Sequence, residues 1–226
     1  MSLAKAIISE LAIVKDILWN QGLSVLSDQE NIDYDLSLPT VILLHGYLVG
    51  APSMRGLADY LKSKNHNVSC EDYAFWKSLE RIELEVEQHL DQVCQKVGNK
   101  VNLVGHSEGG LVACILAKKF PEKVDKAISL GAPFQGTYLA YLNYFVSGAK
   151  DMVPESRYLQ KLREIEFPEK VQFYSLYSPY DEAVIPASSS LLPSRKNIIN
   201  ICVKEVGHGG LIGKSCYNLI EEMLKS

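Results

Sequence analysis

Short apolar runs alternate with longer amphipathic stretches along most of the chain. Apolar runs with the length of buried β-strands are VILLHG after Thr40, NVSC from residue 67, VNLV from residue 101, KVDKAISL from residue 123, VQFYSLYS at 171–178 and NIINICVKE at 197–205. Between them, apolar residues recur at helical spacing, most clearly in SLERIELEVEQHLDQVCQKVG, which Gly98 ends. This alternation predicts a parallel sheet covered by helices on both faces.

Two further helices are predicted near the ends of the chain. Residues 1–22 place Leu3, Ile7 and Leu11 on one face, which predicts an amphipathic helix packed on the domain. A final helix is predicted from about Lys214 to Leu224. No apolar run approaches the roughly 20 residues of a transmembrane helix.

Residues 134–168 interrupt the alternation of strands and helices. The part FQGTYLAYLNYFVSG is rich in aromatic and aliphatic side chains and follows a predicted strand. Two interpretations are about equal: a helix packed on the domain, and a short cap or wall of an acyl pocket. On the second, Phe134 and Tyr138 contact the substrate. Residues 187–194, ASSSLLPS, are predicted to form a mobile loop at the rim.

Length and composition fit a single domain spanning residues 1–226, in which 134–168 is a small insertion. The formal net charge is −4, and no basic stripe suggests a nucleic-acid partner. The five cysteines lie far apart without C-x-x-C spacing, and Cys94, Cys114 and Cys202 fall inside apolar patterns. We therefore expect buried free thiols and a cytoplasmic protein. The alternative is a secreted protein whose native leader was replaced by Met-Ser-Leu.

A serine stands at the junction of the third predicted strand and the helix that follows. Ser107 occupies the centre of G-x-S-x-G, between Gly105 and Gly109. Glycines at these positions allow the tight turn that exposes such a serine, and the positive end of the following helix favours negative charge there. The pentapeptide alone arises often by chance, so its meaning depends on the strand before it and the helix after it.

A serine nucleophile needs a general base, and the chain offers five histidines. His208, in VKEVGHGGL just past the last predicted strand, has the position expected of that base. His89 lies among Glu and Gln within a helix, which predicts a solvated face, and His66 lies in a polar connection. His106 is expected to have a supporting structural role because it neighbours the serine. His45 belongs to the turn after the first strand.

The carboxylate that orients the base should also lie at a strand end. Asp181 does so in LYSPYDEAVIP, directly after the strand at 171–178, and Glu182 is the alternative. The order Ser107, Asp181, His208 is that of α/β-hydrolases and differs from that of chymotrypsin-like and subtilisin-like proteases.

The oxyanion of a tetrahedral intermediate needs two hydrogen-bond donors. The backbone N–H of Glu108, at the start of the helix, is one candidate. The second is expected from the loop HGYLVG after the first strand, where Tyr47 follows a flexible Gly46. Leu48 is the weaker alternative.

The segments HGYLVG, GHSEGG, SLGAPFQGT, SPYDEAVIP and GHGGL together resemble the α/β-hydrolase superfamily, and within it the small bacterial triacylglycerol lipases and esterases. The resemblance runs from about residue 39 to the C-terminus. It implies a mostly parallel central sheet with helices on both faces and a small cap insertion. Two departures stand out: the superfamily's first two antiparallel strands have no clear counterpart, and the metal site of some larger lipases has no recognisable ligand set. We therefore predict no metal and no cofactor.

Carried over to this sequence, the resemblance implies nucleophile Ser107, acid Asp181, base His208 and oxyanion donors at Tyr47 and Glu108. The predicted function is hydrolysis of carboxylic, lipid-like acyl esters through an acyl-enzyme. Contact with a lipid surface is possible for such a protein. A thioesterase, acyltransferase or amidase on the same fold is the alternative. A non-catalytic binding protein is disfavoured because every position of the triad is intact.

Overall fold

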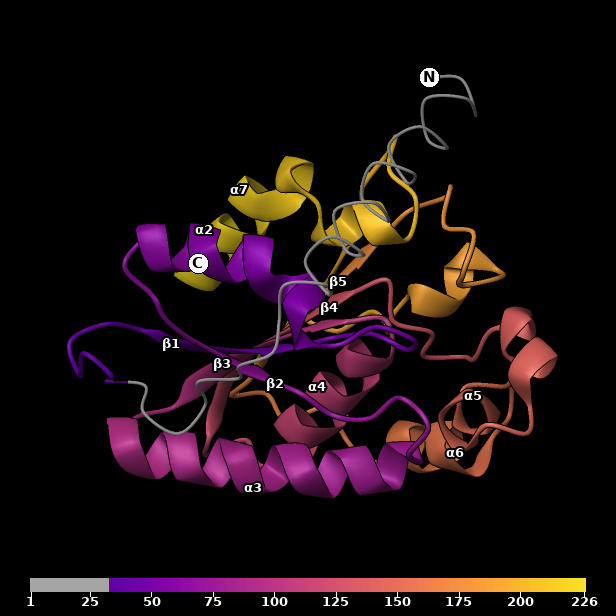
Figure 1. The fold of residues 1–226 in the computed structure, drawn as a ribbon, viewed down its shortest axis with the longest axis horizontal. Coiled ribbons are helices and arrows are strands. Elements are labelled where there is room, and N and C mark those ends of the chain that lie inside the picture. The colour runs from indigo at the N-terminus through magenta and orange to yellow at the C-terminus, as the bar shows by residue number, and fades with distance from the viewer. Residues whose placement is uncertain (1–32) are drawn as a thin grey trace.

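A six-stranded parallel sheet forms the centre of the chain in the computed structural model, which describes residues 33–226 (Figure 1). Its strands are β1 Thr40–Leu44, β2 Asn67–Glu71, β3 Val101–His106, β4 Val124–Leu130, β5 Gln172–Tyr177 and β6 Ile198–Cys202. Their order across the sheet is β2-β1-β3-β4-β5-β6, and every neighbouring pair is parallel. Each predicted strand segment contributes one strand, so the predicted fold class is confirmed.

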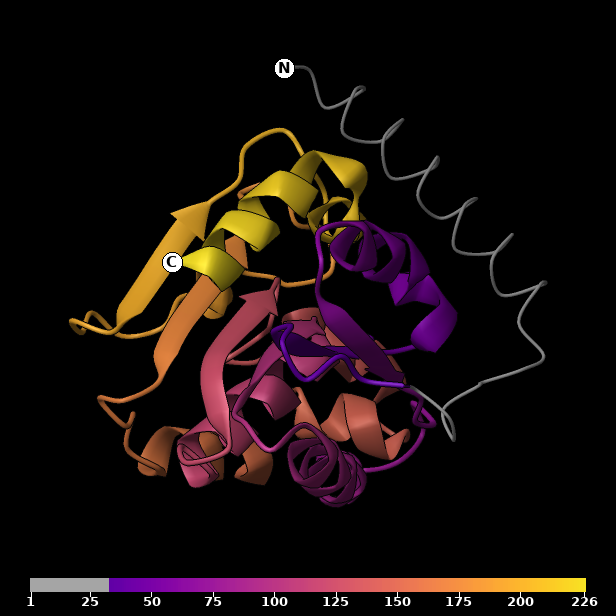
Figure 2. The same cartoon turned by 90° about the vertical axis from the view of Figure 1, so that its left-hand side faces the viewer.

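Helices cover both faces of the sheet (Figure 2). The longer ones are α2 Arg55–Ser63, α3 Leu79–Val97, α4 Glu108–Lys119 and α7 Tyr217–Lys225, and short 3-10 turns occupy Ala51–Met54, Ala187–Ser190, Gly209–Ile212 and Lys214–Cys216. Along β1, Val41 and Leu43 pack with α2 and α7, while Ile42 and Leu44 pack with α3 and α4. Alternate residues of a strand point to opposite faces, so a strand buried on both sides needs the continuous apolar run seen there.

Local signals set the limits of α3 as predicted. The Ser78 side chain accepts a hydrogen bond from the backbone N–H of Arg81 at the start of the helix. At its end, Gly98 adopts the left-handed conformation with φ +68° and donates its N–H to Cys94 O. Glycine adopts the left-handed conformation without a steric penalty from a Cβ atom, so it commonly ends a helix.

Residues 134–168 form three short helices, namely a 3-10 helix at Tyr138–Asn143, α5 Ser147–Asp151 and α6 Arg157–Glu164. Helix α6 packs on the domain through Tyr158, Leu159 and Leu162, which are buried. The 3-10 helix does not: Leu142 in it is 71% exposed and Phe145 just after it is 88% exposed. The insertion therefore combines a packed part with an exposed apolar part, and neither of the two sequence interpretations covers it alone.

Two sequence interpretations are wrong in this structure. His89 does not lie on a solvated face, because its ring bonds Ser69 Oγ at 3.0 Å and Glu71 Oε2 at 3.2 Å on strand β2. Cys202 is exposed rather than buried, since β6 is the edge strand of the sheet. Residues 187–194 begin with the 3-10 helix at Ala187–Ser190, and Ser189, Ser190 and Leu192 are buried. The mobility of this segment stays a prediction.

The turn from β3 to α4 brings backbones into close contact. A Cβ atom added at Gly105 would lie 2.2 Å from Gly109 O, and one added at Gly109 would lie 2.4 Å from His45 O. Real side chains do not approach backbone this closely, so both positions require glycine. These contacts press α4 against β3 and against the end of β1.

We expect Gly105→Ala to lower the free energy of unfolding by at least about 3 kcal/mol, because the methyl group overlaps backbone that cannot give way. Gly98→Ala is the matched control: a Cβ there meets nothing within 4 Å, so only the left-handed φ is penalised, at about 1 kcal/mol. Urea unfolding measures both. Equal losses in the two variants would contradict the close contact at Gly105.

Candidate active site

Ser107 stands in a strained turn between β3 and α4. Its φ is +53° and its ψ is −118°, a conformation that costs a non-glycine residue about 1–3 kcal/mol. The backbone N–H of Ser107 donates to Leu130 O at the end of β4, at 2.8 Å. The turn thus joins the ends of two neighbouring strands, and strain kept at such a place is typical of a functional residue.

His208 and Asp181 form a hydrogen-bonded pair, with 2.8 Å between His208 Nδ1 and Asp181 Oδ2. The second carboxylate oxygen of Asp181 accepts the backbone N–H groups of Ala183 at 2.9 Å and Val184 at 2.7 Å. Burial of the carboxyl raises its pKa, but the His208 contact and these two N–H bonds outweigh burial and hold the pKa below its usual value. Because a carboxylate only accepts, His208 Nδ1 carries the hydrogen, which leaves Nε2 as the acceptor of the ring.

Two more side chains hold the backbone of His208. Glu182 Oε2 accepts the His208 N–H at 3.0 Å, so the alternative acid contacts the main chain while Asp181 contacts the ring. His106 Nε2 donates to His208 O at 3.2 Å, and the two rings lie 4.6 Å apart. Burial, together with the nearby His208, lowers the pKa of His106 to about 3, so this ring is neutral. It supports the His208 loop, which is the structural role expected from the sequence.

Gly131, in the segment SLGAPFQGT, brings the pair to the serine. It adopts a φ of +65°, and a Cβ added there would lie 3.1 Å from both Asp181 Oδ2 and His208 Nδ1. The preceding residue, Leu130, accepts the N–H of Ser107. The end of β4 therefore contacts the serine turn with one residue and the acid–base pair with the next.

The loop after β1 lies against the serine turn on its other side. A Cβ added at Gly46 would lie 3.1 Å from Ser107 Cβ. His45 is fully buried: its Nδ1 donates to Gly46 O at 2.9 Å and its Nε2 accepts the N–H of Tyr73 at 3.2 Å. Within residues 33–226, no hydrogen bond occupies the backbone N–H of Tyr47. Glu108 follows Ser107 at the first position of α4, where a helix leaves its backbone N–H groups without intrahelical partners. Binding of an oxyanion by these two N–H groups stays a prediction.

This arrangement can be compared with known proteins. The family model of the α/β hydrolase fold matches residues 39–164, more than half of the chain. The chain belongs to the α/β-hydrolase fold family.

Named relatives of this α/β-hydrolase include thioesterases and lipases. The chain is 31% identical over 125 residues to the lysosomal thioesterase PPT2 homolog of Drosophila melanogaster, covering 52% of this chain and 43% of that protein. It is 32% identical over 111 residues to a triacylglycerol lipase of Pseudarthrobacter phenanthrenivorans, covering 44% and 34%. The chain therefore matches less than half the length of these curated relatives.

Solved structures share the fold at low sequence identity. The mature form of Bacillus licheniformis lipase BlEst2 aligns with a TM-score of 0.71 and 16% identity, over 86% of this chain and 96% of that one. Aspergillus fumigatus lipase B aligns with a TM-score of 0.74 and 17% identity, over 87% and 55%. At such identities the likeness establishes the α/β-hydrolase fold alone.

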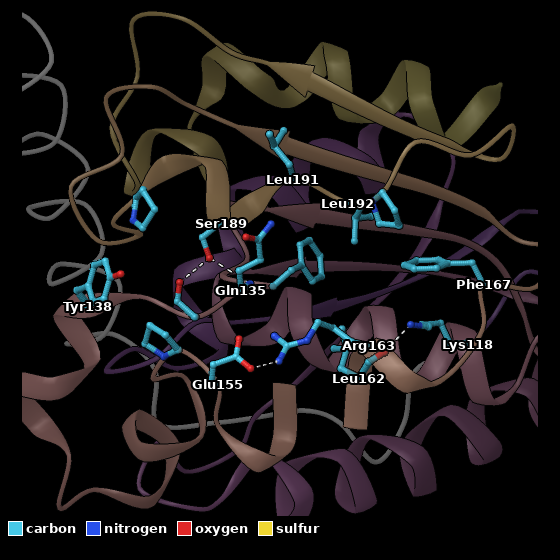
Figure 3. Close-up of a pocket in the computed structure, with 15 residues that line it drawn as sticks. Lys118, Gln135, Tyr138, Glu155, Leu162, Arg163, Phe167, Ser189, Leu191 and Leu192 are labelled. Atoms are coloured by element: carbon cyan, nitrogen blue, oxygen red, sulfur yellow. Dashed lines mark hydrogen bonds and ion pairs between the residues drawn. The ribbon is translucent and has the colours of Figure 1, made fainter. Parts of the chain in front are cut away.

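The two residues predicted to contact substrate line a cavity of about 740 Å³ (Figure 3). Phe134 is buried, whereas Tyr138 is 61% exposed. Ser107, Asp181 and His208 do not line this cavity. Contact of Phe134 and Tyr138 with the substrate therefore stays a prediction.

In the described part of the chain, no group of three or more His, Cys, Asp or Glu side chains is arranged to hold a metal ion. Nor does any helix between residues 33 and 226 have the length and apolar character to cross a membrane.

The side chain of Glu108, unlike its backbone N–H, was not predicted to belong to the site. The carboxyl is fully buried, and neither of its oxygens has a hydrogen-bond partner among the described residues. A Cβ added at Gly148 in α5 would lie 2.8 Å from Glu108 Oε1, so the carboxyl lies against the insertion. Burial, with a smaller effect from Asp151, raises the pKa of Glu108 to about 8. The signal in the sequence was an acid inside a turn between an apolar strand and an apolar helix.

Glu108 should make the protein less stable as the pH rises. Its folded pKa of about 8 lies above the ordinary value of 4.5, so between these values only the unfolded state gives up the proton. The free energy of unfolding then falls with pH, by an amount on the order of a few kcal/mol. Glu108→Gln removes the titrating group and should lose less stability between pH 5 and pH 8 in urea unfolding.

Glu169→Gln, at an exposed carboxyl, is the control and should follow the wild-type pH dependence. If Glu108→Gln also follows it, the buried carboxyl is not the source of the slope.

Proposed function

We propose that this α/β-hydrolase cleaves carboxylic esters through an acyl-enzyme formed on Ser107. The observation that carries the proposal is the Asp181–His208 pair, at 2.8 Å, assembled at the strand end that also holds the Ser107 turn. A strained serine, a histidine with an oriented ring and unoccupied backbone donors are the parts that acyl transfer requires.

In the proposed reaction, Ser107 Oγ attacks the carbonyl carbon of the ester while His208 Nε2 takes the hydroxyl proton. The tetrahedral intermediate carries a negative oxygen, which accepts the N–H groups of Tyr47 and Glu108. The intermediate collapses, and His208 returns the proton to the leaving alcohol. Water, deprotonated by the same histidine, then attacks the acyl-enzyme and releases the carboxylic acid and free Ser107.

Asp181 has two roles in this proposal. Its hydrogen bond from Nδ1 holds the ring of His208 in the tautomer that leaves Nε2 ready to accept a proton. Its negative charge stabilises the imidazolium that forms when Nε2 is protonated. Burial raises the pKa of Asp181, but the His208 contact and two backbone N–H bonds outweigh it, so the pKa stays low enough for both roles.

We further propose that the ester is lipid-like and that the protein touches a lipid surface. Six apolar side chains in one stretch of the insertion are 41–88% exposed, and soluble monomeric proteins rarely expose large contiguous apolar patches. They are Tyr138, Leu139, Tyr141, Leu142, Tyr144 and Phe145. Exposed aromatic residues are suited to the boundary between water and acyl chains.

A thioesterase is the second candidate. The observation in its favour is the similarity to a protein named a lysosomal thioesterase homologue, at 31% identity over 125 residues. Oxygen and thiol esters share the acyl group, the tetrahedral intermediate and the required triad, and they differ in the leaving group. The same acyl chain must therefore be offered with both leaving groups. Acyltransferases and amidases differ in acceptor or substrate on the same machinery.

We expect the purified protein to cleave p-nitrophenyl acyl esters and Ser107→Ala to reduce kcat by at least about 10³-fold, because the attacking oxygen is lost. Release of p-nitrophenol, recorded for acyl chains of increasing length below and above the micelle threshold, measures this. Unchanged turnover in the variant would overturn the nucleophile assignment. A rise above the threshold supports contact with a lipid surface, and its absence argues against that contact.

The matching acyl thioesters, followed by release of free thiol, separate the two candidates. Faster cleavage of the oxygen ester favours the esterase, and faster cleavage of the thioester favours the thioesterase.

Asp181→Asn should lower kcat by roughly 10²–10⁴-fold, because the amide cannot hold the correct tautomer or stabilise the imidazolium. Glu182→Gln is the matched control, since Glu182 contacts only the backbone N–H of His208 in the structure and its loss should cost less than about tenfold. Steady-state kinetics on one ester compare the two. The reverse order of losses would make Glu182 the orienting acid.

A further inference from the structure

The cavity of about 740 Å³ beside α4 is open to solvent and is lined by segments that are distant in sequence (Figure 3). They are the segment after β4, the turn before α6, α6 itself, the loop from α6 to β5, and residues 186–193. This volume lies within the range of pockets that hold small molecules. Ser107, Asp181 and His208 do not line it, so the chemical steps of the proposed reaction take place outside it.

The cavity reaches the end of α4 opposite to Ser107. Lys118 lines the cavity in the last turn of the helix, eleven residues after Ser107. At 1.5 Å per residue, the two lie about 16 Å apart along the helix axis. A group bound at Lys118 is therefore well separated from the attacking oxygen.

Most of the cavity wall is apolar. Phe134, Leu162 and Leu192 line it and are no more than 6% exposed to solvent. Phe167 adds an aromatic ring at the Lys118 end. A wall of this kind favours an aliphatic chain over a polar ligand.

Lys118 is a buried cation without an anionic partner. It is 5% exposed, its ammonium lies 4.0 Å from the centre of the Phe167 ring, and it donates to Leu162 O. Within residues 33–226 no carboxylate lies within 4.0 Å of it, and the carboxylate of Glu166 is bonded to Arg195. An ammonium has three donors, and a buried charge gains strongly from a paired anion.

We propose that this cavity is a second, non-catalytic binding site for an amphipathic carboxylate. The head group lies at the Lys118 ammonium, and the aliphatic chain lies against Phe134, Leu162 and Leu192. A carboxylate supplies the anionic partner that Lys118 lacks, and the chain lies along the apolar part of the wall. Glu155 and Arg163, which also line the cavity, are paired with each other at 2.9 Å. The proposed site rests on the cavity and on Lys118. Carboxylic acids are also products of the proposed ester hydrolysis, and only this link between ligand and reaction rests on the proposed function.

The test measures binding of dodecanoate to the Ser107→Ala protein by calorimetry, with dodecanol and dodecyltrimethylammonium as ligands of equal chain length. We expect one dodecanoate per chain, bound at least about tenfold more tightly than either of the others, because of its charge-assisted bond to Lys118. Equal binding of the anion and the alcohol would overturn the proposal.

Variants assign the binding to this cavity. Lys118→Met should abolish the preference for the anion, whereas Lys62→Met, on the opposite face of the sheet, should not. Leu191→Trp, which fills the cavity from a half-exposed position, should weaken all binding, whereas Leu84→Trp on α3 should not. Dodecanoate binding that survives both Lys118→Met and Leu191→Trp overturns the proposal. If Lys118→Met fails to fold, two other variants test the site. Lys118→Arg should keep the preference for the anion, and Leu191→Trp should weaken all binding; the opposite results overturn the proposal.

Ester turnover of the wild-type protein is measured separately. A protein that cleaves no ester but binds dodecanoate through Lys118 supports this site while contradicting the proposed function. A protein that cleaves esters but shows no anion preference does the reverse.

Discussion

The contact between the backbones of β3 and α4 is the constraint on which the candidate site depends. Only hydrogen atoms fit between Gly105 and Gly109, where a Cβ would lie 2.2 Å from a carbonyl oxygen. This closeness leaves Ser107 no room to relax into the helix and keeps its φ at +53°. The N–H of Ser107 then reaches Leu130 O, which ties the turn to β4. Packing of the sheet against α4 thus maintains the strain at the serine, because the free energy of this packing is far larger than the free-energy cost of the strained backbone.

Buried titratable groups at the same end of the sheet have different protonation states. The hydrogen bonds and the burial of each group determine whether it is charged. Asp181 is ionised because His208 and two backbone N–H groups contact its oxygens. Glu108, equally hidden from water but with no such donors, has a pKa of about 8. His106 is neutral because burial, and to a smaller extent the neighbouring His208 ring, lower its pKa to about 3. One charge is stabilised at this site and the others are suppressed, as expected for a low-dielectric region with few donors.

The sequence could predict what repeats locally along the chain. The β-strands, α3 with its Gly98 stop and the serine turn follow from periodicity and from glycine spacing, and the structure agrees with them. His89 could not be predicted, because its partners lie on β2, eighteen and twenty residues earlier. Cys202 depends on strand order, which no local pattern records. The contact of Glu108 with α5 depends on the path of an irregular insertion. The roles assigned to Ser107, Asp181 and His208 stay predictions that this geometry supports.

The insertion touches α4 at both of its ends. Near the N-terminus of α4, Gly148 lies against the Glu108 carboxyl, beside the backbone donor expected to bind the oxyanion. In the last turn of α4, the ammonium of Lys118 donates a hydrogen bond to Leu162 O. Any displacement of this segment must therefore either break both contacts or bend between α5 and α6. The same 35 residues, 134–168, therefore border both the backbone donor of the proposed ester hydrolysis and the Lys118 cavity of the proposed carboxylate site.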